Sequence, residues 1–134
     1  MQNVPLSVAQ ILEYGRTVHA NTKITTFHGT EDSNGEAETS TFESVGARAS
    51  AFAHALNTDL KMTSDERIAS FLYNCAEHLE VMFAAACKGS VFLPLNKQLM
   101  NDQIRHIINH SNTQVIVADP RMATQLGEVL TGVQ

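Results

Sequence analysis

The sequence predicts an α/β fold: a partial doubly wound, mainly parallel sheet with helices on both faces, preceded by an N-terminal β-hairpin. Short apolar runs of strand length occupy residues 67–73, 91–95 and 114–118. Helical patterns over residues 76–88 and 99–111 separate each run from the next. Because parallel neighbours cannot be joined by a tight turn, this alternation favours parallel strands with right-handed crossovers.

The central helix has a signal at each end. Asn74 stands at the expected N-cap position, and Glu77 follows three residues later as in a capping box. Lys88 places a positive charge in the last turn, and Gly89 can adopt the positive φ that ends many helices. Residues 65–96 are therefore predicted to form one complete strand–helix–strand unit.

The N-terminal elements are predicted from capping and residue patterns. Ser7 and Gln10 have the spacing of a capping box at the start of a helix. This helix is predicted to pack by an apolar stripe of Val8, Ile11, Leu12 and Val18. Two β-branched segments, residues 23–28 and 38–42, flank the turn-rich residues 29–35 and predict a hairpin with a solvated tip.

Two further helices complete the prediction. Thr41 or Ser40 is expected to cap a helix over residues 43–57. Its apolar face comprises Val45, Ala49, Phe52, Ala53 and Leu56. An Asp–Pro pair at 119–120 predicts a last helix over residues 121–130. All these elements are predicted to belong to one doubly wound layer.

Composition narrows the functional classes. The 134 residues form one domain at most, long enough to bury roughly two thirds of the unfolded surface. The 9 basic and 14 acidic residues are scattered, which argues against a nucleic-acid surface. No apolar run approaches the roughly 20 residues of a transmembrane helix, and the N-terminus lacks the pattern of a signal peptide. A cytoplasmic location is expected.

The two cysteines are expected to be reduced thiols. Cys75 and Cys87 lie on one predicted helix, roughly 18 Å apart at 1.5 Å per residue, so they cannot bond to each other. Cys75 lies in the first turn, where the helix dipole could lower a thiol pKa. No histidine adjoins it in sequence to act as a base, and an inert buried cysteine is the favoured interpretation.

Histidines offer weak candidates only. His106 and His110 have the i, i+4 spacing of two metal ligands, but the sequence places no third ligand near them, and solvent-facing histidines are predicted. Glu77 and Glu80 flank His78 in the first turn of the central helix, where acidic groups are favourable, and no further role is predicted. The sequence therefore nominates no catalytic, cofactor-binding or metal-binding residue.

One long stretch resembles a known family. Residues 74–96 read NCAEHLEVMFAAACKGSVFLPLN, and residues 98–119 read QLMNDQIRHIINHSNTQVIVAD. This order of an N-A-E-H-L-E helix, a G-x-V-x-x-x-L-N strand and a Q-I helix resembles the N-terminal region of acyl-CoA synthetases, most closely the medium- and long-chain fatty-acid–CoA ligases. The motif A-x-x-K-G-x-x-x-x-P-L-N, found in the adenylation domains of this superfamily, is present as Ala85, Lys88, Gly89, Pro94, Leu95 and Asn96.

The resemblance implies a function for a longer protein. It implies a ligase that converts a fatty acid and ATP, with magnesium, to acyl-AMP and pyrophosphate, after which the thiol of coenzyme A displaces AMP. The family's phosphate loop, T-S-G-T-T-G-x-P-K-G, does not occur in these residues, and the only similar stretch, residues 29–35, is acidic and would repel phosphate. Residues 1–134 are therefore expected to be the N-terminal part of the large N-terminal domain of an adenylate-forming ligase, inactive alone, with the remainder of the ligase as their partner. The motif residues are expected to build a wall of that domain.

Two other interpretations stay open. The chain could be a free-standing α/β interaction module, or part of a superfamily ligase that stops at acyl-AMP or uses an acid other than a fatty acid. Residues 81–87 of the central helix are apolar on every side. Either the hairpin and first helices cover this strip, or it is exposed with an open sheet edge and promotes self-association, such as a homodimer.

Overall fold

The computed structural model describes residues 7–27 and 36–133, and the sheet at its centre is parallel. Within these residues the sheet has three strands, β3 (Arg67–Phe71), β4 (Val91–Pro94) and β5 (Thr113–Ala118), in the order β4-β3-β5. Ile68 of β3 pairs with Phe92 of β4 on one side and with Val115 of β5 on the other. The predicted parallel sheet is confirmed.

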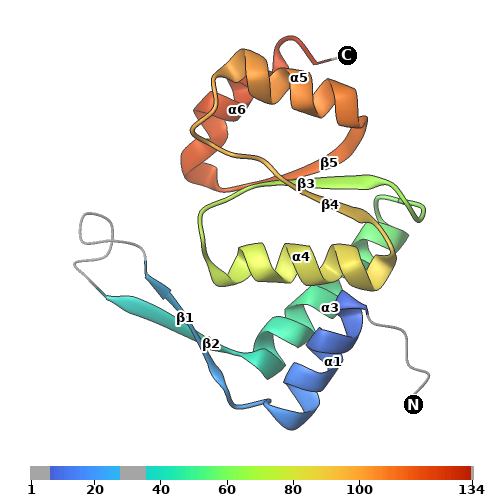
Figure 1. The fold of residues 1–134 in the computed structure, drawn as a ribbon, viewed down its shortest axis with the longest axis vertical. Helices are drawn as coiled ribbons and strands as arrows, with labels where there is room; N and C mark the ends of the chain where they lie inside the picture. Colours follow the sequence, from blue (N-terminus) through green and yellow to red (C-terminus); the bar gives the residue numbers. More distant parts are fainter. Residues whose placement is uncertain (1–6, 28–35, 134) are drawn as a thin grey trace.

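Helices cover both faces of this sheet, as predicted (Figure 1). α4 (Ala76–Lys88) lies on one face, and α5 (Asn101–Ser111) and α6 (Ala123–Leu130) lie on the other. The predicted Asp–Pro start is confirmed, although a 3-10 turn at Pro120–Met122 precedes α6. In the part of the chain that the structure describes, no helix has both the length and the apolar character needed to cross a membrane.

Alternate residues of β3 supply two separate apolar cores. Ile68 is fully buried in the core on the α4 side, whereas Ala69 and Phe71 are fully buried in the core beneath α5 and α6. Ile104 of α5 and Val129 of α6 complete that second core. The division follows from the strand period of two, which points successive side chains to opposite faces.

A second layer of helices encloses α4. α1 (Val8–Val18) and α3 (Phe42–Thr58) pack on the side of α4 that faces away from the sheet (Figure 1). The buried residues of the apolar strip are Val81, Phe83, Ala84 and Ala85. The first helices therefore cover most of this strip, and the alternative of an exposed strip is wrong. Self-association stays a prediction that rests on the open sheet edges.

The hairpin stands apart from the parallel sheet. β1 (Lys23–Phe27) and β2 (Ala37–Thr41) pair antiparallel, with Lys23 opposite Thr41, and form a sheet of their own in the described residues. The predicted hairpin is confirmed, but the prediction of one common layer is wrong, because the hairpin extends from the helical layer beside α4 (Figure 1). The predicted solvated tip lies outside the described residues.

The capping residues predicted from the sequence are confirmed for the start of α1, the start of α3 and the end of α4, and the one predicted for the start of α4 is wrong. Thr41 and Ser44 form a reciprocal capping box at α3, and Gly89 ends α4 with φ of 77°. Ser7 accepts the hydrogen bond of the Gln10 amide at α1. At α4, however, the N-cap residue is Cys75 rather than the predicted Asn74. A distant group binds the backbone at this end: the Ala76 amide donates to Thr26 Oγ1 of the hairpin at 3.1 Å, which satisfies one of the first amides of the helix.

The predicted packing of α1 is wrong in part. Of the four residues in its predicted stripe, only Leu12 is buried, and Val8, Ile11 and Val18 are exposed. The contact with α3 lies to one side of the stripe, at Leu12 and Gly15. A Cβ atom on Gly15 would lie 2.6 Å from Phe42 Cδ1, so the absence of a side chain permits this close approach and sets the face that packs.

Candidate functional site

Aromatic and charged side chains gather where the parallel strands end. Tyr73 follows β3, Lys97 follows β4, and Arg121 follows β5. Lys97 Nζ lies 3.4 Å from the centroid of the Tyr73 ring, and Arg121 Cζ lies 4.3 Å from it. Arg121 also donates to both carboxylate oxygens of Asp119, at 3.0 and 2.9 Å. We call these four residues the carboxyl-edge cluster.

The carboxyl-edge cluster lies at the edge of the sheet where α/β proteins commonly bind ligands. Ligands of open α/β sheets bind outside the carboxyl ends of the strands. A hollow of about 350 Å³ adjoins the cluster, with Leu72, Val117 and Arg121 in its lining. Lys97 and Arg121 bring two positive charges, which Tyr73 holds by cation–π attraction, and Asp119 and Glu77 bring two carboxylates to the lining of the hollow. Sequence reasoning missed the cluster because its members come from three separate loops.

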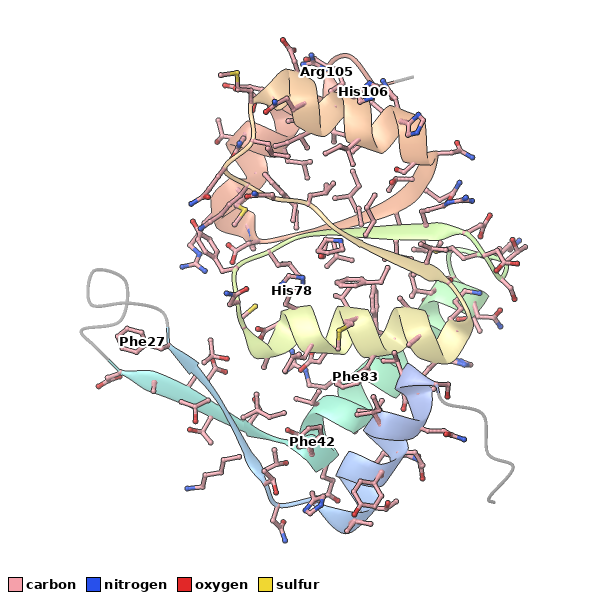
Figure 2. The ribbon with its side chains drawn as sticks, in the orientation of Figure 1. Phe27, Phe42, His78, Phe83, Arg105 and His106 are labelled. Atoms are coloured by element: carbon pink, nitrogen blue, oxygen red, sulfur yellow. The ribbon has the colours of Figure 1, made fainter. Side chains whose placement is uncertain are left out.

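His78 connects α4 to the end of β3. Its Nδ1 lies 3.2 Å from the carbonyl oxygen of Tyr73, and its Nε2 lies 2.9 Å from Ser70 Oγ. A carbonyl only accepts, so Nδ1 carries the proton and Nε2 of the neutral ring accepts from the Ser70 hydroxyl. Figure 2 shows His78 between α4 and the sheet. The sequence prediction, which concerned the acidic residues on either side of His78, did not anticipate these two hydrogen bonds.

The Ser70–His78 pair is structural rather than nucleophilic. Serine and histidine at this distance form the first two members of many acyl-transfer sites. Ser70, however, is fully buried, so an acyl donor cannot reach its hydroxyl. The pair instead fixes the first turn of α4 against the end of β3.

The acidic residues beside His78 join α4 to α3. Arg48 Nε donates to Glu80 Oε2 at 2.9 Å, and Arg48 Nη2 lies 3.7 Å from Glu77 Oε1. Burial raises the pKa of the Glu80 carboxyl above its ordinary value, although the nearby Arg48 guanidinium opposes the shift. These groups act across two helices, which the helix-dipole interpretation of the sequence did not anticipate.

The cysteines are not activated. Burial raises the pKa of the half-buried Cys75 thiol above its ordinary value, although a hydrogen bond from the His78 backbone opposes the shift. Cys87 is largely exposed, but partial burial of its thiol also raises the thiol pKa. A raised pKa keeps a thiol protonated, whereas a nucleophile needs the thiolate. The prediction of an inert Cys75 agrees with this chemistry, although its side chain is half-buried rather than fully buried.

His106 and His110 lie on the outer surface of α5. Both are exposed, as predicted, and their rings stack with centroids 5.7 Å apart (Figure 2 labels His106). Among the residues that the structure describes, no three His, Cys, Asp or Glu side chains are grouped so that they could hold a metal ion.

The A-x-x-K-G-x-x-x-x-P-L-N motif holds the strand–helix–strand unit together. Lys88 Nζ donates to the carbonyl of Met62 at 2.5 Å, across the loop that leads into β3. The carbonyl of Gly89 accepts from the Asp65 amide at 2.9 Å, and the amide of the buried Leu95 donates to the Ser70 carbonyl at 2.9 Å. In this structure Lys88, Gly89 and Leu95 of the motif bind backbone groups, and the wall-building role that the resemblance implies stays a prediction.

Comparison with known proteins places this architecture in a family. The family described as AMP-binding enzyme matches residues 16–133. A medium-chain-fatty-acid–CoA ligase of Ectopseudomonas oleovorans is 26% identical over 129 residues, which cover 96% of this chain and 23% of the relative. A 3-methylmercaptopropionyl-CoA ligase of Ruegeria lacuscaerulensis is 27% identical over 119 residues, which cover 89% of this chain and 21% of the relative.

A solved structure shows the same fold. A protein described as a long-chain-fatty-acid CoA ligase from Rhodopseudomonas palustris superposes with a TM-score of 0.76 at 24% identity. The match covers 96% of this chain and 30% of that chain, so this chain spans less than a third of the relatives it matches. Because the family match extends over most of the sequence, from the end of α1 to residue 133, the chain belongs to the AMP-binding enzyme family.

Proposed function

We propose that this chain is the N-terminal part of the large domain of a cytoplasmic fatty-acid–CoA ligase. The observation that carries the proposal is the family match over residues 16–133. The motif residues Lys88, Gly89 and Leu95 support it, because they hold the unit that the resemblance expects at this place. The ligase would convert a medium- or long-chain fatty acid to acyl-AMP and then to acyl-CoA.

The proposed reaction divides the work between parts of a longer chain. Adenylation replaces a poor leaving oxygen by AMP, and its transition state needs electrostatic stabilisation of the triphosphate. We assign the binding of ATP, magnesium and coenzyme A to residues beyond this chain. The described residues would contribute the scaffold, and alone they are proposed to have no ligase activity.

The first experiment is to read the coding sequence past the codon for Gln134. A segment similar to T-S-G-T-T-G-x-P-K-G within the next hundred or so codons is the expected result. The longer protein should then catalyse ATP–pyrophosphate exchange with octanoate or palmitate and form the CoA thioester, while the 134-residue chain does neither. Exchange by the 134-residue chain alone would overturn the assignment of the catalytic groups.

The same assay tests the other candidates. A ligase for a different acid is supported by the relative described as a 3-methylmercaptopropionyl-CoA ligase, which is 27% identical over 119 residues. Exchange with 3-methylmercaptopropionate and not with fatty acids would favour that candidate, and exchange without thioester formation would favour an enzyme that stops at acyl-AMP. A stop codon directly after Gln134 would favour the interaction module.

A further inference from the structure

A second pocket lies between the hairpin and α4, and Cys75 lines both this pocket and the hollow beside the carboxyl-edge cluster. It has a volume of about 380 Å³, within the range of about 300–1,000 Å³ typical of small-molecule sites. Its walls are formed by the half-buried side chains of Ile24 from β1, Leu79 and Met82 from α4, and Phe92 from β4. Three separate elements therefore supply a largely apolar lining.

The strongest polar groups of the inner wall already bind other parts of the protein, which leaves the proton of the Thr26 hydroxyl and the weakly polar Cys75 thiol. Thr26 Oγ1, in the buried part of β1, accepts from the Ala76 amide at 3.1 Å. Both ring nitrogens of His78 are hydrogen-bonded, to Ser70 Oγ at 2.9 Å and to the Tyr73 carbonyl at 3.2 Å. The His78 ring also meets the Phe92 ring edge to face, with centroids 5.7 Å apart.

The apolar lining and the hydrogen bonds already made by Thr26 and His78 limit which ligands the pocket can bind. A charge brought to the inner wall would have no oppositely charged side chain in the lining, and an extra hydroxyl would exchange its bonds to water for at most the Thr26 hydroxyl or the Cys75 thiol, so both cost free energy. Thr25 and Asn74, which also line the pocket, are exposed. A ligand with an apolar tail and one polar end satisfies both conditions, because the polar end can stay in water beside these two residues.

We propose that the pocket between β1, α4 and β4 is a binding site for a single uncharged aliphatic chain that enters with its apolar end first. The hairpin forms one wall, and the hydrogen bond between Thr26 and Ala76 holds that wall against α4. The proposal does not depend on the proposed ligase activity, because it needs neither ATP nor residues beyond this chain. The two can therefore fail separately.

The test is a titration of the 134-residue chain with 1-octanol, followed by methyl NMR. The methyl signals of Ile24, Leu79 and Met82 should shift together and saturate with one dissociation constant. Titration with 1,8-octanediol gives a matched comparison, because this ligand has the same chain and a second hydroxyl. It should bind about tenfold or more weakly, since the inner hydroxyl would lose most of its hydrogen bonds to water.

Two variants with a matched control locate the site. Met82→Trp fills the pocket, and Thr25→Trp covers its rim from an exposed position, so each should weaken octanol binding about tenfold or more. Met100→Trp makes the same change as the first variant at a residue 76% exposed on the opposite side of the sheet and should leave binding unchanged. The methyl signals of Ile104 and Ile108 in the distant core report whether each variant is folded.

Several outcomes would overturn the proposal. Shifts that do not saturate, or that are equally large at the exposed Ile11 and Val18 of α1, would mean non-specific association with apolar surface. Equal affinity for octanol and octanediol, or unchanged affinity in both pocket variants, would also refute it. Shifts that follow protein concentration without octanol would mean that a second copy of the chain occupies the pocket.

Discussion

The two faces of the parallel sheet are held by segments that lie at different distances along the sequence. On the α5 and α6 face, side chains from residues 69–133 form an apolar core around the fully buried Phe71, and polar bonds such as that of Arg105 to the Val129 carbonyl join residues 24 positions apart. On the α4 face, an apolar core is accompanied by polar bonds between residues far apart in sequence, such as Arg48 with Glu80 and Thr26 with Ala76. Neighbouring residues of β3 therefore face segments that lie near in sequence on one side of the sheet and segments that lie far away in sequence on the other.

The difference explains where sequence reasoning succeeds. An apolar core between successive elements leaves a periodic pattern, because each strand or helix buries a regular subset of its residues. A polar bond between distant segments leaves no period, because each partner is a single residue whose neighbours in sequence do not reveal it. Predictions of stability can test the contrast directly, since β3 presents Phe71 to one face and Ser70 to the other.

The largest effect is expected on the apolar face. Phe71→Ala should lower the free energy of unfolding by about 3–5 kcal/mol, because it removes a fully buried ring and leaves a cavity. Phe27→Ala is the matched control, since Phe27 is 60% exposed, and should change the free energy by less than about 0.5 kcal/mol. Chemical denaturation measures both. Equal losses for the two variants would contradict the assignment of Phe71 to this core.

A smaller effect is expected from Ser70 on the opposite face. Ser70→Ala leaves the half-buried His78 Nε2 without its donor and should cost about 1–3 kcal/mol. Ser90→Ala makes the same change at a hydroxyl that is buried and has no hydrogen-bond partner among the described residues. It should be neutral or stabilising. The comparison fails if Ser90→Ala destabilises the protein as much as Ser70→Ala does.

The bond between the hairpin and α4 is expected to contribute less. Thr26→Val keeps the shape of the side chain but removes the oxygen that accepts from the Ala76 amide, at a cost of about 1 kcal/mol. Hydrogen exchange at the Ala76 amide should become faster as the hairpin loosens. Thr25→Val, on the exposed side of the same strand, is the control and should leave this exchange rate unchanged.

The smallest expected effect is the pH dependence due to Glu80. Its pKa is raised in the folded protein, mainly by burial, so the unfolded chain releases this proton at lower pH. This carboxyl therefore makes the folded state less stable as pH rises from the ordinary value of 4.5 through the raised folded value. Glu80→Gln should remove this part of the pH dependence, an effect below about 1 kcal/mol. Thermal melts of both proteins across this pH range measure it, and parallel curves would contradict the prediction.

Much of the fold could be predicted, and the candidate site could not. The strand–helix–strand unit, the hairpin and the capping of α3 by Thr41 follow from signals within a few residues of each element. The carboxyl-edge cluster escaped prediction because Tyr73, Lys97 and Arg121 meet only when the three strands lie side by side. The predicted strands already placed each of these residues at or shortly after the end of a strand. Because the carboxyl ends of parallel strands meet at one edge of a sheet, their proximity could have been predicted.

The sequence by itself determined the order of elements, their parallel pairing and the family to which the chain belongs, because periodicity, caps and motifs are local. Only the tertiary structure decided which face of α1 packs, what caps α4, and which groups His78 binds. The physical reason is that a buried polar group needs a partner wherever the fold can supply one. At Ala76 that partner, Thr26, comes from a residue 50 positions away in the chain.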